Sequence, residues 1–251
     1  MDLQVTTGTN PGPRRTMIYG PHGVGKSTFA ASAESPIFLQ TEDGLGDIDC
    51  SRMPLPVTLD DFKAQLRAIY RDDHTYATVV IDSLDWLERL VWDQVCVDTG
   101  EKNIADISFG RGYTNALTVW DTILKMLTRI RADKGMAIIL VAHSKIERFA
   151  DPGGESYDRY SPKLHKAASA LCQEWADEVL FATYKVYTKQ NDEGFRKRTV
   201  GIGTGERVLR TTDRPAHIAK NRLGLPDEIP MTWADYSAHF PEGESDAVQP
   251  E

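Results

Sequence analysis

The sequence of 251 residues lacks any long apolar segment. No apolar run approaches the roughly 18 residues that a helix needs to cross a bilayer. Residues 1–13 are polar and lack the apolar core of a secretion signal. We therefore expect no membrane partner and a cytoplasmic location. Residues 1–13 are expected to be a flexible N-terminal segment that precedes a single domain over 14–240.

Cysteine is scarce, with Cys50, Cys96 and Cys172 as the three in the chain. Their spacing matches neither a disulfide framework nor a zinc site. This usage is typical of a reducing compartment, where each thiol is expected to serve as a small buried apolar side chain.

Positive charge is also in deficit, with 29 Lys and Arg against 37 Asp and Glu and a net charge of −8. This balance excludes a protein coated in basic surface, although a local basic groove would suffice for nucleic acid. Residues 241–251 contribute acidic charge and have the composition of a disordered tail. A tail that binds a partner or mimics DNA is the alternative interpretation.

Short apolar runs alternate with amphipathic helical patterns along most of the chain. The runs predict buried parallel strands at 16–20, 37–40, 78–81 and 137–142. The 3.6-residue patterns predict helices at 59–70, 84–97 and 114–131. This alternation is typical of right-handed βαβ units in a parallel sheet.

The pattern changes after about residue 177. Antiparallel strands are predicted at 179–188, 195–202 and 207–211, with turns at 191–194 and 203–205. Residues 151–161, which contain Gly and Pro, are interpreted as a long surface loop. The expected fold is therefore α/β, with a mostly parallel twisted sheet flanked by helices and with antiparallel strands at the C-terminal end.

The stretch Gly20-Pro-His-Gly-Val-Gly-Lys26-Ser27 satisfies the phosphate-binding pattern G-x-x-x-x-G-K-[ST]. It follows an apolar run and opens a helix-prone segment, as a functional P-loop requires. Its backbone N–H groups are expected to face the phosphates of ATP, with Lys26 on the β- and γ-phosphates and the Ser27 hydroxyl on Mg²⁺. The predicted ATP-binding residues are Gly20, Pro21, His22, Gly23, Val24, Gly25, Lys26, Ser27 and Thr28.

Two acidic positions fit the chemistry of hydrolysis. Asp82 ends the apolar run 78–81, as the Walker B acid does, and is expected to hold Mg²⁺ together with Ser27. Glu42 follows the second predicted strand and is expected to orient or deprotonate the attacking water. Asp43, beside a turn glycine, is the alternative to Glu42.

Three further residues are candidates for contact with the γ-phosphate. His143 ends the fourth predicted strand, where it could bond the γ-phosphate or the water, or be an ordinary polar strand end. Lys220 and Arg222 occupy alternate positions, so their side chains share one side of an extended segment. Such a pair could neutralise γ-phosphate charge across a subunit interface, or simply be a basic turn.

Together, the P-loop, Glu42, Asp82-Ser83, His143 and Lys220/Arg222 resemble the RecA-like ATPase core of recombinases and hexameric replicative helicases. More narrowly, the chain is similar over about 16–232 to phage-encoded RecA-core ATPases of the AAA-domain type, some of which are single-strand annealing recombination proteins. This resemblance implies a homo-oligomer, either ring or filament, in which Glu42 activates water. It also implies γ-phosphate sensing by His143, where the family usually has glutamine, and action of Lys220 and Arg222 in trans.

The resemblance also implies that two loops face single-stranded DNA. The expected DNA-binding cations are Lys102 and Arg111 in 99–112, and Lys145, Arg148, Arg159 and Lys163 in 144–163. Cations mixed with aromatic rings suit a single strand, because charges follow the phosphates and rings stack on bases. The alternative is a pair of solvated loops without a ligand.

The expected function is a DNA-stimulated ATPase that binds single-stranded DNA in phage recombination or annealing. A single-strand DNA-binding or replication protein is a further expected partner. The alternatives are a phage replication helicase or helicase loader, and a nucleotide-gated scaffold that holds a replication protein through its acidic tail.

Overall fold

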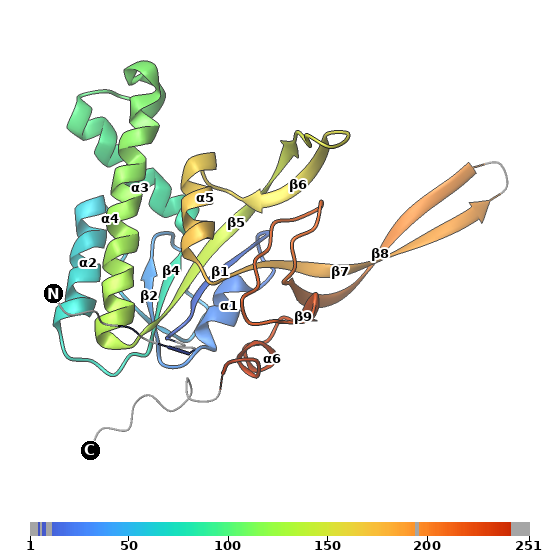
Figure 1. Ribbon diagram of the computed structural model, residues 1–251, viewed down its shortest axis with the longest axis horizontal. Helices are drawn as coiled ribbons and strands as arrows, with labels where there is room; N and C mark the ends of the chain where they lie inside the picture. Colours follow the sequence, from blue (N-terminus) through green and yellow to red (C-terminus); the bar gives the residue numbers. More distant parts are fainter. Residues whose placement is uncertain (1–4, 6, 9–11, 194–195, 242–251) are drawn as a thin grey trace.

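The computed structural model describes residues 5, 7–8, 12–193 and 196–241, and within them one twisted sheet of nine strands forms the centre of the molecule (Figure 1). The strands are β1 (Arg15–Gly20), β2 (Pro36–Gln40), β3 (Ser51–Arg52), β4 (Thr78–Asp82), β5 (Ala137–Phe149), β6 (Tyr157–Pro162), β7 (Glu178–Glu193), β8 (Arg196–Arg210) and β9 (Glu228–Pro230). Their order is β3-β2-β4-β5-β1-β7-β8-β9, and β6 pairs with the far end of β5. The first six strands in this order, from β3 through β2, β4, β5 and β1 to β7, pair in parallel, whereas β8, β9 and β6 pair antiparallel to their neighbours.

Helices cover both faces of this sheet. They are α1 (Lys26–Ala31), α2 (Leu59–Arg71), α3 (Leu84–Thr99), α4 (Arg111–Lys134), α5 (Lys166–Trp175) and α6 (Trp233–Ser237), with single 3₁₀ turns at Ile104–Asp106 and Ser108–Gly110. The helix α2 begins at a capping box in which Thr58 and Asp61 bond each other's backbone N–H groups. The predicted α/β fold class is therefore confirmed.

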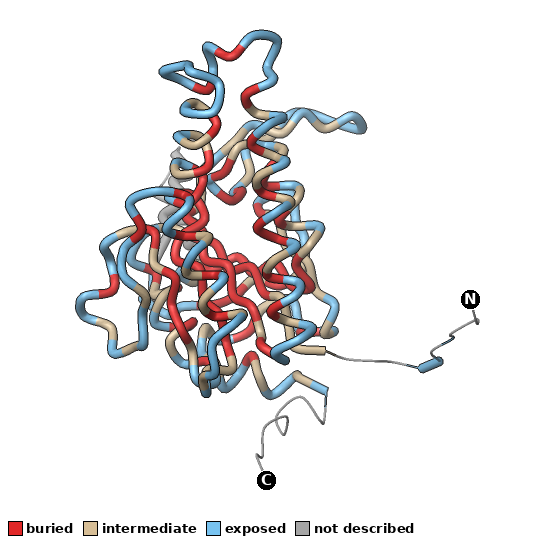
Figure 2. The backbone as a smooth tube through the Cα atoms, turned by 90° about the vertical axis from the view of Figure 1, so that its left-hand side faces the viewer, coloured by how far each residue is buried: buried red, intermediate tan, exposed pale blue. Residues whose placement is uncertain are grey.

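Two apolar cores separate the layers, because successive side chains of a buried strand point to opposite faces. In β1, Met17 and Tyr19 pack with helices α2 to α5, whereas Ile18 packs with α1 and α6. Figure 2 shows the buried backbone gathered in the centre of the molecule and the connection between α3 and α4 mostly exposed. The sheet is therefore covered on both sides, as a parallel sheet requires.

Ion pairs at the start of β1 fix its pairing with β7. Arg14 pairs with the fully buried Glu178, and Arg15 Nη2 lies 2.7 Å from Asp177 Oδ1. Burial raises the pKa of Glu178, and the hydrogen bond and charge of Arg14 oppose that rise. These contacts lie at the end of β1 opposite Gly20, so the carboxyl ends of the strands are left for the functional residues.

The structure corrects several boundaries predicted from the sequence. The strand β5 continues to Phe149, and β6 occupies the second half of the predicted 151–161 loop. The predicted strands 195–202 and 207–211 form one strand, β8, so the predicted turn at 203–205 is wrong. Gly205, with φ of 76°, instead lies where the register with β7 shifts, because a glycine accommodates a bulge as readily as a turn.

Other predictions have partial or no structural counterpart. Asn191, Asp192 and Glu193 of the predicted 191–194 turn pair with β8, whereas Gly194 and Phe195 lie outside the described residues. Most of the predicted 1–13 segment and of the 241–251 tail also lies outside them. Within the described parts of the chain, no helix has the length and apolarity needed to cross a membrane.

Candidate functional site

The predicted P-loop connects the carboxyl end of β1 to the first turn of α1, which confirms the strand–loop–helix context. Gly23 and Gly25 have φ of 72° and 99°, in the region that favours glycine. At Gly20 a Cβ would lie 2.2 Å from the carbonyl oxygen of Ala182 on β7, so the strand packing itself requires glycine there. Val24 is fully buried and anchors the loop in the apolar core beside α1.

Lys26 is held inside this loop. Its side chain is buried, and Nζ donates to the carbonyl oxygens of Gly20 at 3.1 Å and Pro21 at 2.8 Å. Burial lowers the pKa of Lys26, whereas the neighbouring carboxylates Asp82, Asp85 and Glu42 raise it. The ammonium group therefore lies among the acidic residues of the site, at the mouth of the loop.

Ser27 and Asp82 meet beside Lys26 and fit a magnesium ion. Asp82 ends β4, and its side-chain oxygen Oδ2 is buried without a hydrogen-bond partner among the described residues. Burial raises the pKa of Asp82, while a hydrogen bond with Ser27 and the charge of Lys26 lower it. Within the described residues, no cluster of three or more His, Cys, Asp or Glu could hold a metal. A single carboxylate with a hydroxyl suits Mg²⁺, which usually completes its shell with phosphate oxygens and water.

Glu42, His143 and Asp85 lie together next to the P-loop, and His143 is hydrogen-bonded to Asp85. His143 lies opposite Gly20 in the pairing of β5 with β1. Its Nδ1 is 3.0 Å from both carboxylate oxygens of Asp85, and its Nε2 is 3.9 Å from Glu42 Oε1. Because a carboxylate only accepts, Nδ1 carries the proton, and Nε2 is directed toward Glu42.

The charges of this group are set by burial and by these contacts. Burial would raise the pKa of Asp85, but the hydrogen bonds from the His143 ring and backbone N–H lower it to about 2. Burial raises the pKa of Glu42; the neighbouring His143 lowers it, and the charges of Asp82 and Asp85 raise it further. Asp85 is thus a fixed anion that orients His143, and Glu42 has the raised basicity that a group taking a proton from water needs.

His22, in the P-loop, stacks on His143 with ring centroids 3.8 Å apart. Burial lowers the pKa of His22, and its neighbours His143, Lys26 and Lys163 lower it further, so its ring stays neutral at physiological pH. The stack joins the loop directly to the last residue of β5 that pairs with β1. The remaining predicted ATP-binding residues, Pro21 and Thr28, lie on the loop and on the exposed side of α1.

Sequence reasoning missed Asp85, which contacts His143. It lies in the first turn of α3, directly after the Walker B strand. The sequence signal was an acidic residue three positions after Asp82. The same residue is equally well explained as a carboxylate that stabilises the N-terminus of a helix.

Lys220 and Arg222 lie away from their own P-loop, beside Val179 and Asp177 at the start of β7. Lys220 Nζ donates to the carbonyl oxygens of Gln173 and Glu174, both at 3.0 Å, and to that of Ala176, at the end of α5. Arg222 Nη1 is 3.0 Å from Asp177 Oδ1, and its side chain is 55% exposed. The structure does not bring this pair to the site of the same chain, and its role across a subunit interface stays a prediction.

The predicted DNA-binding cations fall into two groups, those whose side chains contact another group of the chain and those exposed to solvent, which we call the open cations. Lys145 Nζ donates to the Leu164 carbonyl oxygen at 2.7 Å, Arg148 Nη1 lies 3.8 Å from Asp158 Oδ1, and Arg159 Nη2 lies 2.9 Å from Asp213 Oδ1. Lys102, Arg111 and Lys163 are exposed. Arg148 joins the two strands of the β5–β6 hairpin, whereas Lys145 and Arg159 tie the hairpin to the segments that follow β6 and β8. The open cations are therefore the better candidates for contact with DNA.

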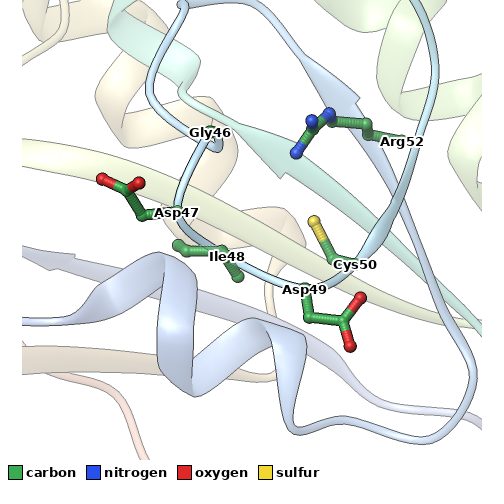
Figure 3. Close-up of a pocket in the computed structure, with 6 residues that line it drawn as sticks. All are labelled: Gly46, Asp47, Ile48, Asp49, Cys50 and Arg52. Carbon is green, nitrogen blue, oxygen red and sulfur yellow. The ribbon is translucent and has the colours of Figure 1, made fainter.

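Two pockets lie near these elements. One, of about 570 Å³, lies on the connection from β2 to β3 and is lined by Gly46, Asp47, Ile48, Asp49, Cys50 and Arg52 (Figure 3). It contains none of the predicted site residues, and its two aspartates make it a poor site for an anion. The other, of about 380 Å³, lies between α3 and the residues that follow β6, and is lined by Asp85, Glu88, Arg89, Trp92, Lys145, Lys163, Leu164 and His165.

Comparison with known proteins identifies a family for the domain that carries this site. A family model described as an AAA domain matches residues 12–223, which include every predicted nucleotide-site residue. A comparison with curated proteins finds no match to the chain.

Proposed function

The chain belongs to the AAA domain family of P-loop ATPases, and on that basis we propose that it couples ATP hydrolysis to the binding of single-stranded DNA. The observation that carries the ATPase part is the meeting of Lys26, the unpaired Asp82 Oδ2 and the Glu42–His143–Asp85 group at one edge of the sheet. Each of these groups has a role in phosphoryl transfer to water.

The residues divide the chemistry among them. The P-loop N–H groups and Lys26 bind the phosphates of ATP, and Ser27 and Asp82 would hold Mg²⁺, which supplies charge neutralisation when bound. Glu42 orients the attacking water and accepts its proton, a role favoured by the raised pKa of Glu42. Asp85 holds His143 in one tautomer, in which Nε2 accepts a hydrogen bond from the attacking water beside Glu42. Contact of Nε2 with the γ-phosphate would require a second proton on the ring, because phosphate oxygens only accept.

The proposal of DNA binding is supported by the elements around the second pocket. The α3–α4 connection and the β5–β6 hairpin both project beyond the sheet (Figure 1). The connection bears Phe109, whose side chain is 94% exposed, between the open cations Lys102 and Arg111. Exposed aromatic rings among cations suit a single strand, whose bases are free to stack.

A route from ATP to DNA is supported by the same pocket. Asp85 contacts His143 in the nucleotide site and also lines the pocket that contains Lys145 and Lys163. A movement of His143 on hydrolysis would therefore be transmitted by Asp85 to the pocket that the β5–β6 hairpin residue Lys145 lines. We propose that the ATP cycle alters DNA affinity in this way, within a homo-oligomer completed by Arg222 and Lys220 of neighbouring subunits.

The test is ATP turnover with and without single-stranded DNA, over a range of salt concentrations. Single-stranded DNA should raise kcat, and Lys26→Ala should abolish turnover, while the exposed Lys125→Ala serves as the matched control. Equal turnover with and without DNA at every salt concentration would reject the DNA part alone. If Lys26→Ala hydrolyses ATP as fast as Lys125→Ala and the wild type, the assigned P-loop is rejected.

The biological setting proposed is phage recombination or strand annealing, supported by the resemblance to single-strand annealing ATPases. A single-strand DNA-binding or replication protein is the partner that such a role implies. Annealing of complementary strands by the purified protein, with ATP and with Lys26→Ala as control, measures this directly. No acceleration of annealing over the spontaneous rate would reject this setting.

A further inference from the structure

The long β7–β8 hairpin, which projects to the right in Figure 1, begins directly beside the P-loop. The hydroxyl of Tyr184 on β7 donates to the carbonyl oxygen of Gly23 at 3.1 Å. Ala182, on the same strand, presents its carbonyl oxygen to Gly20 so closely that a Cβ there would be 2.2 Å away. The base of the hairpin therefore contacts the phosphate-binding loop at two of its glycines.

Arg207 lies directly opposite Tyr184, on β8. Its guanidinium reaches over the loop, and its Nη1 is 2.6 Å from the point that a Cβ of Gly25 would occupy. Gly25 immediately precedes Lys26, whose backbone N–H belongs to the phosphate-binding set. The guanidinium thus lies at the rim of the loop from which phosphates are bound.

The charge of Arg207 is not neutralised by a counter-ion in the described part of the chain, where no hydrogen bond or ion pair of its side chain is found. The other cations at the base of the hairpin differ in this respect. Lys185 Nζ lies 3.0 Å from Glu228 Oε1, and Arg210 Nη1 lies 2.7 Å from Glu228 Oε2. Arg207 is exposed, so it is accessible to an anion from solvent.

We propose that Arg207 binds the phosphates of the nucleotide in the P-loop of its own chain, with Tyr184 as a positioning residue that holds the loop against the hairpin. This inference rests on the proposed nucleotide site and adds a cation that the P-loop pattern does not contain. A guanidinium presents planar paired donors that match phosphate oxygens, which an ammonium cannot reproduce. The contact is made to bound nucleotide before the reaction, so it lowers Kd and KM and leaves kcat nearly unchanged.

The experiment measures Kd for MgATP and MgADP by calorimetry on the full chain, together with the melting temperature without nucleotide. Arg207→Gln should weaken nucleotide binding by about tenfold or more, and Arg207→Lys should restore part of the loss. Arg210→Gln, which removes the same charge on the same strand, should leave Kd within about twofold of the wild type. Tyr184→Phe, which removes only the hydroxyl, should weaken binding by less than Arg207→Gln.

The outcomes separate this inference from the proposed function. A loss shared by ATP and ADP supports contact with the α- or β-phosphate, and a loss confined to ATP supports contact with the γ-phosphate. If wild type binds nucleotide and Arg207→Gln binds equally well, the inference is wrong and the nucleotide site stands. If Arg207→Gln lowers the melting temperature and Arg207→Lys restores no affinity, Arg207 is structural and the inference is again wrong. If wild type binds neither nucleotide, the nucleotide site itself is rejected.

Discussion

At the scale of single residues, the site depends on Asp85 and His143. The fixed negative charge of Asp85, whose pKa is lowered to about 2, selects the tautomer of His143 that presents Nε2 to Glu42. Such a carboxylate–histidine pair orients an imidazole without itself contacting the reacting atoms. Asp85 is therefore a positioning residue for whichever contact His143 makes.

Asp85→Asn tests this role. The amide keeps the shape but can donate to His143 Nδ1, so the other tautomer becomes accessible and kcat should fall by roughly 10- to 100-fold. The Kd for MgATP should change by less than about threefold, because Asp85 lies behind the phosphate-binding residues. Steady-state ATPase assays and calorimetry measure the two effects, with the exposed Asp121→Asn as control. An unchanged kcat would show that Asp85 only packs α3 against β5.

Gly20→Ala provides a residue-scale test of the packing of the P-loop against β7. The added methyl would lie 2.2 Å from a backbone oxygen, which cannot move without separating β1 from β7. We expect a drop in melting temperature of about 2–12 °C, since overpacking of this kind costs roughly 1–3 kcal/mol and each kcal/mol lowers the melting temperature of a domain this size by about 2–4 °C. Gly46→Ala is the matched control, because a Cβ at Gly46 meets nothing within 4 Å and Gly46 has ordinary φ. Equal melting temperatures for the two variants would contradict the close approach.

At the scale of elements, helix α3 is joined to the start of α5 by a buried carboxylate. Glu88 on α3 accepts the backbone N–H of His165 at 3.0 and 2.9 Å. Burial raises the pKa of Glu88 from 4.5 to about 7, against the opposing effects of that N–H and of Lys145. We therefore expect the contact between Glu88 and the start of α5 to depend on pH near neutrality.

The sign of this effect follows from linkage. Below pH 4.5 Glu88 is protonated in both folded and unfolded chains, so it carries no penalty. Between 4.5 and about 7 the unfolded chain ionises first, so stability is lost as pH rises, and above 7 the loss is constant. Glu88→Gln keeps an acceptor for His165 but removes this loss. The free energy of unfolding of this variant, relative to that of the wild type, should increase from pH 5 to pH 8 by up to about 3 kcal/mol. The difference in melting temperature between the two proteins should grow in the same direction. A difference that is flat with pH would contradict the raised pKa.

The predictability of the elements followed their length and regularity. The strands and helices of the βαβ units have strong periodic patterns, and the sequence located them closely. The short strands β3 and β9 and the short helix α6 have no such pattern, and the sequence missed them. It also missed the helix α5, although α5 has ten residues. The strand β5 was cut short at residue 142 because beyond it the side chains alternate between exposed and partly buried, as in a hairpin that leaves the core.

At the scale of the whole molecule, the proposal that a neighbouring subunit completes the nucleotide site depends on Arg222. The Arg222 side chain is 55% exposed, and it lies beside Asp177 at the start of β1, whereas the P-loop of its own chain follows the other end of β1. Only a second copy of the chain could bring this residue to a γ-phosphate. Lys220, whose Nζ donates to three carbonyl oxygens at the end of α5, already has a structural role within the chain.

Mixing two inactive variants tests the shared site. Lys26→Ala lacks the P-loop lysine and Arg222→Ala lacks the exposed guanidinium, so each alone should show greatly reduced ATP turnover. In mixed oligomers some sites combine an intact P-loop from one subunit with an intact Arg222 from another, and turnover should reappear. Single variants at the same total concentration are the controls. Failure of the mixture to exceed the sum of its components would contradict action in trans.

The sequence by itself determined the parts that depend on neighbouring residues. The glycines, Lys26 and Ser27 specify the P-loop, because positive φ and helix initiation are local backbone preferences, and strand–helix alternation specifies the parallel sheet. Only the tertiary structure decided which distant groups meet there. Asp85 reaches His143 and Arg207 reaches Gly25 because sheet order and register place α3 and the β7–β8 hairpin on either side of the loop. Those contacts depend on the closure of long chain segments, for which a local pattern has no signal.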